Sequence, residues 1–572
     1  MDVSMGRARW WPVAACITLV LGCGGGGGDD EAVTPPPGSG NPPSNPPVSY
    51  SLIESEASAQ RFLSTTTFGG THADIDALVG RDAAEWLADE FAKPAVAYTP
   101  RVRPLLTQNL TSFGQSRADR NHHSDFFWEA AIGADDQLRQ RALFALSQIV
   151  VVGQTTNNHP HRYAPYMDAL YLNAFGNYRD ILQDITYTPA MGRYLTYENN
   201  RKADPNTGRL PDENYAREIL QLFSIGLLEL NMDGTPELQG GETIETYDND
   251  DIVNLARVFT GLRFQRDLGP DGWIEPLLMF ENFHSEAEKA FLDTMIPAGT
   301  TGDVTISLAL DGIFAHDNVA PFIGRQLIQR FTMSSPPPEY VERVATAFES
   351  GSFEAGNGRQ FGTGQRGDMQ ATLAAVLLDP LMFEDTVAGK LREPVLRFVH
   401  LVRGMETTNI AAANENRLRN TSDSGTSLGQ HPFRPPSVFN FYRPGYVAPN
   451  TVSGDQGMTA PELQIVNGAS SIGYLNFMTD YVYDRSSNGG TDSFAPNYDP
   501  WLSLVDDSAA LVDDLDLLFT GGRLPVGERS DIVALIDQMP LRTGNNLAND
   551  QLRRVQTAIL LVTTSPTFAV VQ

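Results

Sequence analysis

A row of polar side chains recurs at helical spacing near the middle of the chain. At 100° per residue its members fall within an arc of about 100°, and they are Asn214, Arg217, Glu218 and Gln221. If the row is buried, its members must hydrogen-bond one another or bind something, because an unpaired buried charge is very costly. The row is therefore a solvated face, a structural polar network or a functional site. For a site, the catalytic candidates are Glu213, Arg217 and Glu218, and the binding candidates are Asn214 and Gln221.

Oxygen-bearing side chains lie directly upstream of this row. Asp204, Asn206 and Asp212 are spaced in a way that resembles a calcium-binding loop, and oxygen ligands suit that ion. The match to an EF-hand is incomplete, because Gly208 stands where a third ligand is usual. Gly208 and Pro211 equally suit a plain turn that leads into a helix. No cofactor is required by any motif, and calcium is the ion that this loop would suit.

Composition and absent motifs exclude several function classes. The 572 residues carry 41 Lys and Arg against 70 Asp and Glu, a formal net charge of −29, which disfavours nucleic-acid binding. Two cysteines, Cys16 and Cys23, exclude a disulfide framework and a cysteine-ligated zinc site. The chain has no G-x-S-x-G elbow, no phosphate-binding glycine loop and no H-E-x-x-H pair.

Helical periodicity must position these side chains. Asp135 to Val152 starts with acids and becomes almost wholly apolar, which predicts a central buried helix. Asp212 to Leu228 predicts a helix that carries the polar row, and Leu230 to Tyr247 predicts a small hairpin or ordered loop. We expect a mainly α fold, a large multi-helix domain over residues 51–572 with small β-hairpin or loop insertions. If it divides into two lobes, 51–262 and 302–572, the turn-rich stretch Arg263 to Thr301 joins them.

The N-terminal residues predict export and a lipid anchor. Arg7 and Arg9 precede an apolar stretch of about a dozen residues that is too short to span a bilayer as a mature helix. The junction before Cys23 resembles a bacterial lipoprotein signal, which makes residues 1–22 a signal peptide and Cys23 the site of acylation, palmitate included. Residues 23–50 are rich in Gly and Pro and predict a disordered tether. Gly24 after the cysteine favours the outer membrane by resemblance to known sorting behaviour.

Several segments together resemble one bacterial family, catalogued as domain of unknown function 1800. They include NRKADPNTGRLPDENYAREILQLFSIGL (Asn200 to Leu227), FRPPSVFNFY (Phe433 to Tyr442) and the closing SPTF (Ser565 to Phe568). The resemblance implies an exported bacterial protein, often encoded beside a second exported family related to sulfatases and phosphatases. It implies no established activity.

The chain departs from the family in one stretch. Many members carry Trp-His-Asn-His-Phe where this chain has Ala145 to Ile149, with Gln148 at the second histidine position. Any metal or proton-transfer role of those histidines cannot be carried over to this chain.

These observations favour a cell-envelope lipoprotein that is an accessory or binding protein for an extracellular partner or a polysaccharide. Its expected partners are the membrane, through the lipid anchor, and a co-exported sulfatase- or phosphatase-related protein. The alternative is an envelope enzyme, hydrolase-like, that uses a polar cleft around Asp212 to Glu218. The sequence leaves open whether the protein is catalytic.

Overall fold

The computed structural model describes residues 52–106, 122–153, 160–384, 389–407, 418, 420–483 and 496–571. The predicted signal peptide, Cys23 and the tether lie outside these residues and stay predictions. Residues Ser49–Gln572 form one compact unit. The possible division into lobes 51–262 and 302–572 stays a prediction.

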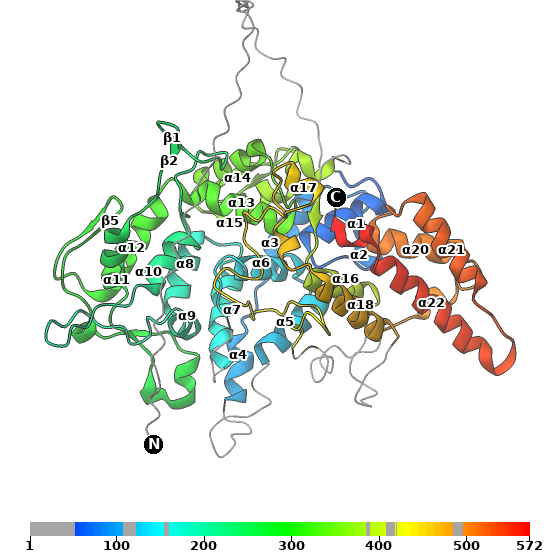
Figure 1. Ribbon diagram of the computed structural model, residues 1–572, viewed down its shortest axis with the longest axis horizontal. Coiled ribbons are helices and arrows are strands. Elements are labelled where there is room, and N and C mark those ends of the chain that lie inside the picture. The colour runs from blue at the N-terminus through cyan, green and yellow to red at the C-terminus, as the bar shows by residue number, and fades with distance from the viewer. Residues whose placement is uncertain are drawn as a thin grey trace, which may run out of the picture. The chain divides into compact units, whose positions relative to one another are not determined.

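The fold is mainly helical, as predicted, with only small two-stranded sheets in the described part (Figure 1). The helices of the first half are α1 (Glu56–Thr66), α2 (His72–Leu78), α3 (Ala83–Ala92), α4 (Thr99–Val102), α5 (His122–Gly133), α6 (Gln137–Ser147), α7 (Tyr163–Leu172), α8 (Tyr178–Tyr187), α9 (Pro189–Tyr194), α10 (Asn214–Gln221) and α11 (Asn249–Val258). Those of the second half are α12 (Gly302–Ala315), α13 (Val319–Phe331), α14 (Pro338–Ser350), α15 (Met369–Leu377), α16 (Pro394–Gly404), α17 (Val452–Asp455), α18 (Gly468–Val482), α19 (Asp499–Leu502), α20 (Ser508–Thr520), α21 (Val526–Gln538), α22 (Leu547–Thr563) and α23 (Pro566–Ala569).

The strands form antiparallel pairs. Four pairs are local hairpins: β1 (Leu238–Gln239) with β2 (Glu242–Thr243), β3 (Leu262–Arg263) with β4 (Leu278–Met279), β5 (Lys289–Phe291) with β6 (Thr294–Ile296), and β7 (Phe353–Glu354) with β8 (Gln360–Phe361). The first of these confirms the hairpin expected between Leu230 and Tyr247. The fifth pair joins β9 (Lys390–Leu391) to β10 (Val570–Val571), so the last residues of the chain contact its middle.

Helix α6 confirms a buried helix within the predicted stretch Asp135 to Val152, although the helix itself runs only from Gln137 to Ser147. Every residue from Gln137 to Leu146 is buried, including Arg139 and Arg141. The helix packs against α3, α5, α7 and α13, which come from both halves of the chain. The apolar run from Ala142 to Leu146 fits this position, because a helix covered on all sides has no solvent face to keep polar.

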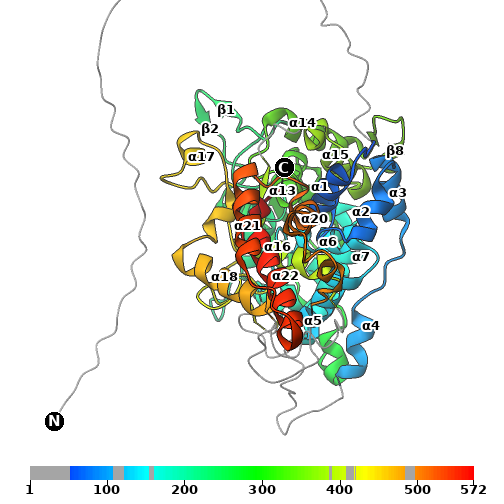
Figure 2. The ribbon, with the colours of Figure 1, turned by 90° about the vertical axis from the view of Figure 1, so that its right-hand side faces the viewer.

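The carboxyl-terminal helices pack together and return to the start of the fold. In both views α20, α21 and α22 lie side by side (Figures 1 and 2). Helix α1 contacts α20 and β10, which brings the first helix against the last strand. No helix in the described ranges has the length and apolar character needed to cross a membrane.

Helix α10 is shorter than predicted. The sequence predicts a helix over Asp212 to Leu228, whereas α10 begins at Asn214 and ends at Gln221. The hydroxyl of Ser224 bonds back to the carbonyl oxygen of Leu220, and Gly226 then adopts a φ of 77°. A side chain at Gly226 would also collide with Phe322, since a Cβ there would lie 2.7 Å from its ring. Glycine therefore lets the chain turn sharply at this point and lie against α13.

Candidate functional site

The predicted polar row of α10 does not act as one group. Arg217 faces Glu213 at 3.5 Å, and both side chains are well exposed. The Asn214 side chain is directed elsewhere, and its amide donates to the hydroxyl of Thr196 at 2.7 Å. For these residues the geometry is that of a solvated helix face with local hydrogen bonds.

Glu218 differs from its neighbours on the row. Its side chain is partly buried, and its Oε2 atom has no hydrogen-bond partner in the described part of the chain. Burial raises the pKa of Glu218, and nearby Arg217 offsets part of that rise. Burial, together with the charge of Glu218, raises the pKa of Tyr194 to about 12. A carboxyl that is partly desolvated in this way is a proton-transfer candidate.

The predicted calcium ligands each make local contacts. Asp204 accepts the backbone N–H of Asn206 at 3.0 Å and pairs across a tight turn with Arg209. Asp212 accepts the hydroxyl of Thr196 at 2.9 Å and the N–H of Asn214 at 3.0 Å. Within the described ranges, no group of three or more His, Cys, Asp or Glu side chains could hold a metal ion. Calcium binding by Asp204, Asn206 and Asp212 stays a prediction.

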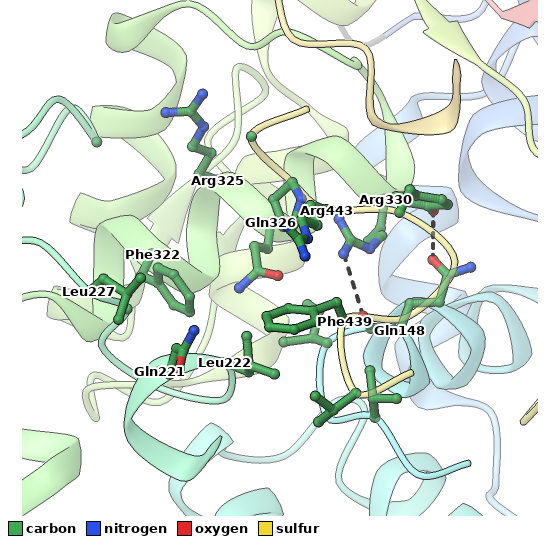
Figure 3. A pocket seen from close by; sticks show the side chains of 18 of the residues that line it. Gln148, Gln221, Leu222, Leu227, Phe322, Arg325, Gln326, Arg330, Phe439 and Arg443 are labelled. Atoms are coloured by element: carbon green, nitrogen blue, oxygen red, sulfur yellow. Dashed lines mark hydrogen bonds between the residues drawn. The ribbon is translucent and has the colours of Figure 1, made fainter. Parts of the chain in front are cut away.

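Gln221, at the end of the row, reaches a cavity of about 430 Å³ (Figure 3). Its walls come from the end of α6, the end of α10, α13 and the loop over 438–445. Apolar side chains line most of it, among them Leu222, Phe322 and Phe439. The polar side chains in its wall are Gln148, Gln221, Arg325, Gln326, Arg330, Tyr442 and Arg443. Of the predicted site residues, Gln221 alone lines this cavity.

A buried polar network lies against one wall of the cavity; we define it as Arg141, Gln148, Arg330, Glu393, Gln430 and Tyr442. Its centre is the Glu393 carboxylate, whose Oε2 accepts the amides of Gln148 at 2.6 Å and of Gln430. The Tyr442 hydroxyl lies 3.1 Å from Gln148 Oε1 and 3.3 Å from Glu393 Oε2. Each of these residues is almost fully inaccessible to solvent. These shared hydrogen bonds hold Gln148, Gln430 and Tyr442 around one oxygen of the Glu393 carboxylate.

Two arginines complete the network without an ion pair. Arg330 Nη2 donates to the backbone oxygen of Gln148 at 3.4 Å, and its guanidinium lies 5.2 Å from the centre of the Tyr442 ring. Arg141 donates to the backbone oxygen of Arg330 and lies over the Phe331 ring. Burial lowers the pKa of Arg141 to about 10, against the opposing effect of Glu393. Arg141 therefore stays charged at neutral pH, although it is buried.

The segment around β9 explains how the chain places Glu393. Lys390 on β9 is buried, donates to the carbonyl oxygen of Gln329 at 2.8 Å and pairs with Glu462. The other carboxylate oxygen of Glu462 accepts the hydroxyl of Ser334 at 2.8 Å. These bonds fix the strand against the end of α13, so Glu393 enters the interior just before Pro394 starts α16.

The cavity wall is suited to binding. Among the described residues that line it, there is no carboxylate, histidine, serine or cysteine to act as acid, base or nucleophile. Its polar groups are amides, guanidinia and one phenol, and such groups are able to orient a ligand.

The sequence interpretation missed the buried network, although signals for it were present. Arg141 directly precedes the apolar run Ala142 to Leu146, and a charge in such a place requires a partner in the folded protein. The stretch Lys390 to Glu393 holds three charged residues directly before a helix. Gln148, where the family resemblance implies a histidine in many members, lies in the cavity wall and bonds Glu393.

Comparison with known proteins gives one match. The model of the family described as "Protein of unknown function (DUF1800)" matches residues 61–570. No curated protein and no solved structure matches the chain. Because the match extends over nearly the whole folded region, the chain belongs to the DUF1800 family.

Proposed function

We propose that this protein is an exported lipoprotein of the cell envelope that binds an extracellular partner or polysaccharide through the cavity beside α10 and α13. The support for export is the N-terminal pattern that ends at Cys23, with the outer membrane as the expected place of anchoring. A co-exported sulfatase- or phosphatase-related protein is the proposed protein partner.

The observation that carries the binding proposal is the cavity itself. Its volume of about 430 Å³ lies within the range of small-molecule sites, and its lining combines apolar surface with a few convergent polar groups. A site of that size takes one or two sugar rings or a short segment of a larger ligand. The absence of carboxylate and histidine side chains from its described wall favours binding over catalysis.

Blocking the cavity tests this proposal. A Cβ added at Gly445, which lines the cavity, meets no atom within 4 Å, so Gly445→Trp adds bulk there without a backbone clash. Gly527→Trp is the matched control, because its Cβ is equally unobstructed and it does not line the cavity. Calorimetry of the purified mature lipoprotein with oligosaccharides released from the native envelope should show binding that Gly445→Trp weakens at least tenfold. Equal affinity in both variants, or no binding to the wild type, overturns the proposal.

Anchoring is tested separately. Cys23→Ser should move the protein from the membrane fraction to the soluble exported fraction. Mass spectrometry of the wild-type N-terminus should show an acylated cysteine. An unmodified thiol, or a cytosolic wild-type protein, contradicts the proposed location.

An envelope enzyme is the second candidate, and Glu218 is the observation that favours it. Its Oε2 atom has no partner in the described part of the chain, and burial raises its pKa toward values useful to a general acid. Glu218→Gln and Arg217→Gln should abolish hydrolysis of envelope oligosaccharides if this candidate is correct. Unchanged activity in folded variants removes it.

A further inference from the structure

The cavity wall contains hydrogen-bond donors that the protein does not satisfy. Arg330 lines the cavity, and its Nε and Nη1 atoms have no partner among the described residues. The Nε2 atom of Gln326, also buried and in the wall, lacks a partner as well. In Figure 3 the Gln326 amide projects into the space framed by Gln221, Phe322 and Phe439. Buried donors left unpaired are unfavourable, so this wall suits a ligand that brings acceptors.

The charge of the buried network also favours an acceptor that is negative. Arg141 and Arg330 are two buried cations, and the carboxylate in their network is that of Glu393. In the described part of the chain no ion pair within 4.0 Å joins Glu393 to either arginine. The neighbouring Lys390–Glu462 pair is already balanced. One positive charge of the network is therefore left without a counter-charge, in a protein whose net charge is −29.

A third arginine lies at the open side of the same cavity. Arg443 lines the wall, is exposed, and stacks over the Phe439 ring with its guanidinium carbon 4.6 Å from the ring centre. In Figure 3 the guanidinium of Arg330 lies between Gln148 and Arg443, whereas that of Arg325 points away from the other labelled side chains. The guanidinium groups of Arg330 and Arg443 and the amide of Gln326 thus border the same cavity. Its other walls are mainly aromatic and aliphatic side chains.

We infer that the cavity binds the oxyanion group of its ligand, a carboxylate, sulfate or phosphate, through Gln326, Arg330 and Arg443. The apolar or ring face of the ligand packs against Phe439 and Phe322. Guanidinium groups bind oxyanions with strong, charge-assisted hydrogen bonds, and an oxyanion offers several acceptors to the unpaired donors. This inference rests on the proposed binding function and specifies the chemistry of the ligand.

Small aromatic probes of matched size test the inference by calorimetry with the purified mature lipoprotein. Phenyl phosphate, phenyl sulfate and benzoate carry the three oxyanions, and benzyl alcohol is the neutral counterpart. We expect the best oxyanion probe to bind at least tenfold more tightly than benzyl alcohol, with affinity that falls as salt rises. The ranking of the three probes identifies the oxyanion that the site prefers.

Two variants locate the binding. Arg443→Gln removes an exposed charge, and Gln326→Leu removes the unpaired amide with little change in volume. Each variant should lower the affinity for the preferred oxyanion probe at least fivefold and leave the affinity for benzyl alcohol unchanged. Arg529→Gln makes the same change in net charge at a partly exposed arginine that pairs with Asp513 and does not line the cavity. It should leave the affinity for every probe unchanged.

The outcomes separate this inference from the function on which it rests. Equal binding of neutral and anionic probes, blocked by Gly445→Trp, overturns the oxyanion inference and keeps the binding function. Oxyanion binding that Arg443→Gln and Gln326→Leu do not weaken also overturns it. Failure of every probe to bind contradicts both.

Discussion

The exposed half of the α10 polar row and the buried network beside the cavity use the same kinds of side chain in opposite surroundings. Arg217 and Glu213 pair at 3.5 Å at the surface, where water solvates both charges. Arg330 and Glu393 lie in the interior, where a missing partner is not replaced by water. Residue type and spacing alone pointed to the first region, whereas burial makes the second the stronger candidate.

Removing the central carboxylate is expected to give the largest effect. Glu393→Ala leaves Arg141 and Arg330 buried without their carboxylate and releases the amides of Gln148 and Gln430. The free energy of unfolding should fall by about 3–5 kcal/mol, measured by urea denaturation of the mature protein. A loss below about 1 kcal/mol would show that the network is solvated in solution.

Removing one hydroxyl from the same network should have a smaller effect. Tyr442→Phe keeps the ring against Arg330 but takes away the hydroxyl near Gln148 and Glu393. We expect a loss of about 1–2 kcal/mol in the free energy of unfolding. Tyr446→Phe, at a half-buried tyrosine of the same loop, is the control. An equal change in the two variants would contradict a special role for the network.

Glu218 is partly buried and belongs to the α10 row, and it should make stability depend on pH. Burial raises its pKa in the folded protein above the ordinary value of 4.5, so the folded state binds its proton more tightly than the unfolded state does. Its contribution to stability is therefore most favourable below pH 4.5 and declines as pH rises through the folded-state pKa. Glu218→Gln should remove this decline, and urea denaturation from pH 4 to pH 8 measures it. A wild type and variant with parallel pH profiles would contradict the raised pKa.

The surface pair should contribute least. Arg217→Gln breaks the contact with Glu213, and the free energy of unfolding should change by less than about 0.5 kcal/mol. Denaturation at low and high salt checks this value. A loss above about 1 kcal/mol would mean that the pair is more strongly coupled than its exposure implies.

Local patterns predicted much of the fold. The buried helix α6 lies within Asp135 to Val152, and the β1–β2 hairpin lies within Leu230 to Tyr247, the stretches from which the sequence predicts them. The end of α10 was not predictable, because the helix ends at Gln221 and the chain then turns at Gly226 against Phe322, a residue about a hundred positions away. The buried network was also not predictable, because it too depends on contacts between residues far apart in the sequence. Gln148, Glu393 and Tyr442 come from three distant segments, and no local period relates them.

The position of a bound probe in a crystal tests the account most directly. A crystal structure of the mature protein with phenyl phosphate should place the phosphate within hydrogen-bond distance of Gln326, Arg330 or Arg443, with the ring against Phe439. If, at saturating concentration, the phosphate binds elsewhere on the protein and not in this cavity, the assignment of the cavity as the functional site is contradicted.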